Sequence, residues 1–124
     1  MNVNEINVIT LAYIGDAIYE VYIREKLINL GIYKVDNLQK EAIKYVSAKG
    51  QALILNNLID NNILSQDELD IVRRGRNNKR NVHPKNTDIM TYKFSTGFEA
   101  LIGYLYLKKD YERLEEIFKY IEVK

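Results

Sequence analysis

Two carboxylic acids, Asp16 and Glu99, occupy positions that structural requirements alone do not favour. Asp16 lies between Gly15 and Ala17 in the middle of a predicted long helix, where Asp and Gly are both poor helix formers. Glu99 interrupts the apolar helical segment FEALIGYLYL at residues 98–107. Burying either charge alone costs several kcal/mol, so each acid needs a partner. The pattern indicates a site built from two inward-facing carboxylates.

The residues around these two acids leave room for a hydrated divalent cation. Small or hydroxylic side chains lie one helical turn away: Ala12, Ser95, Thr96 and Gly103. Glu20 follows Asp16 by four residues and shares its helix face, as a further ligand or as a group just outside the ligand set. Structural roles are the alternative: Asp16 as a buried hydrogen-bond acceptor, Glu99 paired with a Lys or Arg, and Glu20 as a solvated helix residue.

The positive charge of the chain is concentrated in residues 71–87, which hold six basic residues and no acid. These six are Arg73, Arg74, Arg76, Lys79, Arg80 and Lys85. A solvated loop is the ordinary explanation of such a run, but the lack of compensating acids favours contact with a polyanion such as the phosphates of a nucleic acid. The segment contains no aromatic side chain, which favours a duplex over a single strand. We assign no role to His83.

The elements that must position these residues are predicted to be helices, because the chain has one Pro, six Gly and apolar residues at helical spacing. The predicted helices cover residues 11–30, 37–46, 48–61, 69–76, 95–109 and 111–123. Their predicted N-cap residues are Thr10, Asp36, Ser47, Ser65 with Glu68 as a capping box, and Asp110. We expect an all-α bundle of about six or seven helices in one domain over residues 1–124, with residues 98–107 at its centre.

Composition excludes several classes of function. Without Cys the chain has no disulfide, no thiol nucleophile and no Cys-based zinc site, and one His cannot form a multi-His metal cluster. There is no apolar run long enough for a transmembrane helix. The N-terminus lacks the pattern of a secretory signal, so we expect a cytoplasmic protein.

Five segments together resemble a known enzyme family. LAYIGDAIYEVYIR at residues 11–24 resembles the ribonuclease III signature around its catalytic Asp, and FEALIGYLYL resembles the second carboxylate motif of that family. VSAKGQA at residues 46–52, RRGRN at 73–77 and PKNTDIMTYKFST at 84–96 are similar to the Mini-ribonuclease III branch. Each motif alone is weak, whereas the ordered set is specific.

The resemblance implies a ribonuclease III-like helical endonuclease domain that works as a homodimer and cleaves double-stranded RNA with Mg²⁺, with Mn²⁺ as a substitute. It implies that Asp16 and Glu99 are the metal-binding catalytic carboxylates. The products would carry 5′-phosphate and 3′-hydroxyl ends, and the expected substrate is the precursor of the large-subunit (23S) ribosomal RNA. Since the sequence ends at Lys124, we expect RNA binding to come from this domain and its basic segment.

The sequence departs from full-length ribonuclease III at three positions where that family has carboxylates, namely Ile9, Ala12 and Thr96. Mini-ribonuclease III shares these losses, which leaves the number of metal ions and the full ligand set open. Two other functions remain as alternatives. One is a non-catalytic duplex-RNA-binding module of the same fold, and the other is a helical interaction scaffold.

Overall fold

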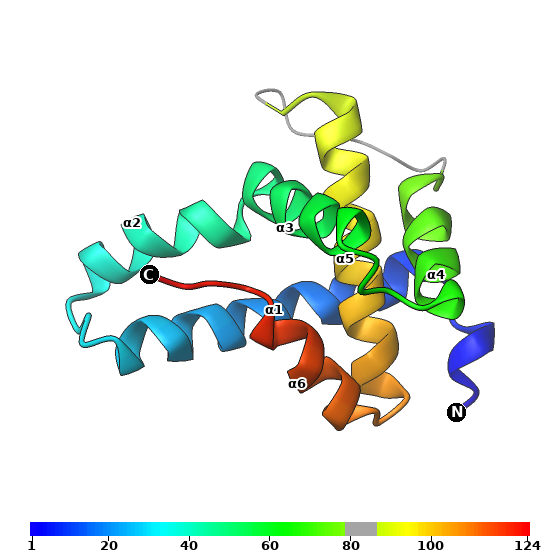
Figure 1. Ribbon diagram of the computed structural model, residues 1–124, viewed down its shortest axis with the longest axis horizontal. Helices are drawn as coiled ribbons and strands as arrows, with labels where there is room; N and C mark the ends of the chain where they lie inside the picture. Colours follow the sequence, from blue (N-terminus) through cyan, green and yellow to red (C-terminus); the bar gives the residue numbers. More distant parts are fainter. Residues whose placement is uncertain (79–86) are drawn as a thin grey trace.

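The structure is a computed structural model that describes residues 1–78 and 87–124 (Figure 1). The described residues form helices and no strand, as predicted. The elements are η1 Val3–Glu5, α1 Val8–Asn29, α2 Val35–Val46, α3 Ala48–Asp60, α4 Gln66–Arg76, α5 Ile89–Leu107 and α6 Tyr111–Lys119. Within these residues, no helix combines the length and the apolar character needed to cross a membrane.

Helix α5 is the centre of the bundle, as the sequence predicts. It contacts α1, α3, α4 and α6, while α2 packs on α1 and α3 (Figure 1). Between Ser95 and Leu105 all of its residues except Glu99 are buried, with Phe98, Leu101 and Ile102 fully enclosed. A helix that is apolar all round must be covered by other elements, and here four helices cover it.

Helices α1 and α5 cross so closely that their backbones touch at two glycines. A Cβ atom added to Gly15 would overlap the backbone carbonyl oxygen of Glu99. One added to Gly103 would overlap the backbone carbonyl oxygen of Leu11. Both positions therefore require a residue without a side chain, and the interior glycines that weaken each helix allow this contact. The crossing brings Asp16, the residue after Gly15, to the part of α5 that carries Glu99.

Local capping signals are confirmed at three helices and wrong at two. The confirmed N-caps are Ser47, Ser65 with its capping box, and Asp110. Helix α1 begins three residues earlier than predicted and is capped by Asn7 instead of Thr10. Helix α2 begins at Val35, so Asp36 lies in its first turn and caps nothing. Asp88 caps α5, which begins six residues before the predicted helix 95–109.

The inward face of α1 is not the one that apolar spacing favours. Val21 and Ile28 keep helical spacing with Leu11, yet they are 62% and 45% exposed. Tyr19, Ile23 and Leu27 are fully buried instead. The apolar residues of α1 lie on all sides of the helix, so their spacing alone does not identify a buried face. The contact with α5 determines which side is covered.

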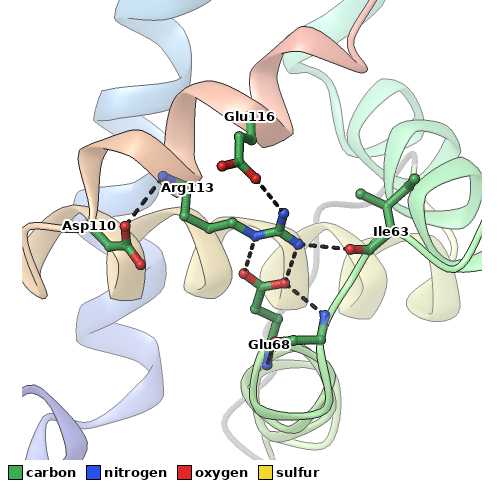
Figure 2. A network of polar contacts seen from close by, with 6 residues as sticks. Ile63, Glu68, Asp110, Arg113 and Glu116 are labelled. Atoms are coloured by element: carbon green, nitrogen blue, oxygen red, sulfur yellow. Dashed lines mark hydrogen bonds and ion pairs between the residues drawn. The ribbon is translucent and has the colours of Figure 1, made fainter.

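An ion pair between Glu68 and Arg113 fixes α6 against the start of α4 (Figure 2). Arg113 donates to both carboxylate oxygens of Glu68 at 2.7 Å and to the backbone oxygen of Ile63 at 2.7 Å. Burial raises the pKa of Glu68, but hydrogen bonds from Arg113 and Ser65 outweigh it and bring this pKa below its usual value. A bidentate pair with these extra bonds is the geometry in which a buried carboxylate is fully satisfied.

We expect Gly103→Ala to lower the free energy of unfolding by about 1–3 kcal/mol, because the new methyl group must force α1 and α5 apart. At an ordinary helix position the same change would stabilise the protein by up to about 1 kcal/mol. Urea denaturation of the wild type and the variant distinguishes these results. Unchanged or increased stability of the variant would contradict the close crossing.

Candidate functional site

The carboxyl groups of Asp16 and Glu99 meet where α1 crosses α5. Both side chains are partly buried, and they lie close enough to share a hydrogen bond. In residues 1–78 and 87–124, no Lys or Arg forms an ion pair with either acid. The predicted alternative, a structural pair between Glu99 and a basic side chain, is therefore absent from the described part of the chain. What the crossing brings together is a pair of acids.

The surroundings of Glu99 raise its pKa to about 8. Burial is the largest cause, followed by the hydrogen bond to Asp16 and the negative charge of Asp16, with a smaller contribution from the charge of Glu20. A hydrogen bond from Gln51 acts in the opposite direction. Burial and the neighbouring acid thus favour the protonated form of Glu99 when no cation is bound. A cation between the two acids would replace that proton and allow both to ionise.

Gln51 is a site residue that the sequence interpretation missed. Its side chain is 1% exposed, and its Nε2 atom donates to Glu99 Oε2 at 3.2 Å and to the backbone oxygen of Val46 at 3.1 Å. Gln is a common surface residue of helices, so the residue type did not indicate that this side chain is buried. The available signal was its position between the small residues Gly50 and Ala52 in the VSAKGQA segment.

Glu20 lies near the acid pair but has its own partner. It forms an ion pair with Arg24 at 3.1 Å, one turn further along α1. Its charge still contributes to the raised pKa of Glu99. Among the residues that the structure describes, no group of three or more His, Asp or Glu side chains forms a metal-binding cluster. Any cation held by this part of the chain depends mainly on the two acids.

The donor set nevertheless suits Mg²⁺. Carboxylate oxygens are its preferred protein ligands, and it commonly binds through one or two of them while retaining water and substrate phosphate oxygens. The two hydroxylic residues predicted beside the acids use their hydroxyl groups elsewhere. Ser95 and Thr96 donate their hydroxyl protons to the backbone oxygen of Tyr92, at 2.7 and 3.1 Å. Two acids without a basic partner in the described residues fit a hydrated divalent cation.

The described part of the predicted basic segment lies in the last turn of α4. Arg73 pairs with Asp70 at 2.9 Å, and Arg74 is exposed. The guanidinium of Arg76 lies 5.8 Å from the ring centre of Phe94 on α5. The C-terminal end of α4 and the start of α5 lie at the same end of the molecule (Figure 1). The remaining predicted residues lie outside the described ranges: Lys79, Arg80, His83 and Lys85.

Comparison with known proteins identifies the family to which this fold belongs. Residues 9–110 match the ribonuclease III domain family. The Mini-ribonuclease 3 of Streptococcus pneumoniae is 46% identical over 94% of this chain and 91% of its own length. That of Thermoanaerobacter sp. is 50% identical over 88% of this chain and 75% of its own length. A crystal structure of a Fusobacterium nucleatum protein superposes with a TM-score of 0.82 at 35% identity, covering 93% of this chain and 90% of that one.

The chain therefore belongs to the ribonuclease III family, and within it to the Mini-ribonuclease III branch. It is an endoribonuclease of a family that acts on double-stranded RNA and generally uses divalent metal ions. The all-α ribonuclease III-like fold expected from the sequence is confirmed.

The raised pKa of Glu99 predicts a pH dependence of stability in the metal-free protein. Between the ordinary value of 4.5 and about 8, the folded protein binds more protons at this group than the unfolded chain does. The stabilisation from this proton is fully present below pH 4.5 and is lost as pH rises through about 8. We expect Glu99→Gln to remove this contribution, as measured by urea unfolding in EDTA across this pH range. The same pH dependence in wild type and variant would contradict the raised pKa.

Proposed function

We propose that this enzyme hydrolyses double-stranded RNA with Mg²⁺ held by Asp16 and Glu99, leaving 5′-phosphate and 3′-hydroxyl ends. The observation that carries the proposal is the meeting of these two acids at the crossing of α1 and α5, with no basic partner in the described residues. Mn²⁺, which also takes oxygen ligands, is a suitable substitute. Glu20 lies just outside the ligand set, because Arg24 already pairs with its carboxylate.

Different residues of the chain would bind the metal ion and the RNA. Asp16 and Glu99 would hold the ion through their carboxylate oxygens, with Glu99 in its ionised form. A bound divalent cation lowers the pKa of a water molecule and offsets the charge of the phosphate. The basic residues Arg73, Arg74, Arg76, Lys79, Arg80 and Lys85 hold the RNA backbone. Contacts to phosphates carry no base information, so the enzyme selects duplexes mainly by A-form shape.

We propose that the enzyme acts as a homodimer through the outward face of α1. Tyr13 and Val21 on this face are 81% and 62% exposed, although both are large apolar side chains. An apolar groove beside it runs between α1 and α2, lined by Ile28, Val35 and Ile43, and it reaches Glu20 near the acid pair. A second copy covering this surface would bring two sites together, one for each strand of the duplex.

The biological substrate is proposed to be the precursor of the 23S ribosomal RNA, processed in the cytoplasm. This assignment rests on the similarity of the motifs to Mini-ribonuclease III. We also propose that residues 1–124 act as one catalytic domain, which is consistent with the family match over residues 9–110.

The first test is cleavage of a long RNA duplex by the wild type, Asp16→Asn and Glu99→Gln in Mg²⁺ or EDTA. We expect cleavage to need the metal and each variant to lose more than about 100-fold in rate, a larger loss than removal of a group that only supports a ligand causes. Glu112→Gln, at an exposed position of α6, is the matched control and should retain most activity. Cleavage in EDTA or full activity of Glu99→Gln would contradict the site. Binding without cleavage in both Mg²⁺ and Mn²⁺ would instead favour an RNA-binding module.

Arg73→Gln combined with Arg74→Gln should weaken duplex binding in EDTA and flatten its salt dependence, by about one unit of logarithmic slope per lost phosphate contact. The matched control is Lys108→Gln with Lys109→Gln, which removes the same charge at the opposite end of α5. Fluorescence anisotropy at several salt concentrations gives both slopes. Equal slopes in the arginine variant and the wild type would show that these arginines of α4 do not contact the RNA phosphates.

Val21→Asp should convert the dimer into monomers, because a charge would be buried in the apolar contact. Leu53→Asp is the control, since Leu53 is 63% exposed on α3 and lies outside the α1–α2 groove. Sedimentation velocity measures both masses. A wild-type monomer, or a Val21→Asp variant that remains dimeric, would contradict the proposed interface.

A further inference from the structure

The side chain of Gln51 is held in one orientation beside the acid pair. Its Nε2 atom donates to two acceptors from different elements, Glu99 Oε2 on α5 and the backbone oxygen of Val46 at the end of α2. Reversing the amide would place its oxygen against two other acceptors, so the hydrogen bonds determine which end faces Glu99. Gln51 therefore links the end of α2 to one oxygen of the Glu99 carboxyl group.

This arrangement leaves a polar atom unsatisfied. Oε1 of Gln51 is buried and has no hydrogen-bond partner among the described residues. A buried acceptor without a donor costs about 1–3 kcal/mol, which an apolar residue of similar size would avoid. The neighbouring inward residues of α3, Ala52 and Leu55, are apolar. Packing alone therefore does not explain a Gln at this position, and such exceptions occur at functional sites.

The backbone that carries Gln51 is firmly placed. Ser47 caps α3 by accepting a hydrogen bond from the backbone N–H of Gly50 at 3.1 Å. Gly50 packs directly on the backbone of α2, where a Cβ atom would overlap the carbonyl oxygen of Lys44. A side chain that starts from a fixed backbone and makes two hydrogen bonds can hold its partner with little freedom.

We propose that Gln51 is a positioning residue of the metal site, whose amide holds the Glu99 carboxyl group beside Asp16 and so strengthens binding of the divalent cation. The inference rests on the proposed role of Asp16 and Glu99 as metal ligands. Without the amide, the Glu99 carboxyl group can rotate away from Asp16, and an ion must order it on binding. Gln51 thus acts through Glu99 and makes no contact with RNA.

The test measures Mn²⁺ binding to the full chain without RNA, by the electron paramagnetic resonance signal of free Mn²⁺. The variants are Gln51→Met, which keeps the length of the side chain without the amide, and Gln51→Leu, which serves if the first variant folds poorly. We expect about tenfold weaker binding than in the wild type, the loss typical of groups that orient a ligand. Gln66→Met, at an exposed position of α4, is the control and should bind Mn²⁺ as the wild type does.

Cleavage of duplex RNA over a range of Mg²⁺ concentrations separates positioning from a structural role. A positioning role raises the half-maximal Mg²⁺ concentration of Gln51→Met about tenfold, while saturating Mg²⁺ restores the maximal rate to within about twofold of the wild type. A structural role lowers the maximal rate through loss of folded enzyme and leaves the half-maximal concentration unchanged. The second result, or wild-type Mn²⁺ binding by both Gln51 variants, would overturn the inference.

Glu99→Gln in the same Mn²⁺ experiment distinguishes this inference from the proposed function. Weak binding by Glu99→Gln together with wild-type binding by the Gln51 variants would leave the metal site in place and remove only the role of Gln51. Wild-type binding by Glu99→Gln would overturn the metal site and the inference together.

Discussion

The backbone contact between α1 and α5 is the constraint on which the candidate site depends. Because Gly15 and Gly103 lack side chains, the two helices approach until their backbones touch, and Asp16 and Glu99 meet at that point. If both were ionised the two acids would repel each other, and this repulsion together with burial is what raises the pKa of Glu99. The packing of the buried residues of α5 fixes the crossing, so the pair stays together and a cation can replace the proton.

Glu68 and the Asp16–Glu99 pair are acid centres with different arrangements. Glu68 receives two hydrogen bonds from Arg113 and one from the backbone of Ser65, so its charge is balanced within the chain (Figure 2). Glu99 accepts a hydrogen bond from the neutral amide of Gln51, and its other close polar partner is the acid Asp16. The first arrangement stabilises the contact of α6 with α4. The second lacks a positive partner in the described residues, and a divalent cation would supply one.

The sequence predicted features that depend on local chemistry and missed those that tertiary contacts decide. The capping box at Ser65 was predictable because side chain and backbone meet within four residues. The acid pair was predictable because a carboxylate in an apolar helix is anomalous wherever that helix lies. The inward face of α1 was not, since residues such as Val21 are apolar on a side that the chain leaves uncovered. Gln51 was missed because its burial comes from the contact of α3 with α5.

The uncovered side of α1 connects the site to the proposed assembly. Tyr13 and Val21 are exposed on the helix whose other positions carry Asp16 and the core residue Tyr19. Exposed large apolar side chains next to a polar site are typical of surfaces that bind another protein. One helix would then fix both the local position of the acids and the separation of two sites in a dimer. Since A-form RNA places the two strands at a set distance, such a dimer would select duplexes by geometry, without reading bases.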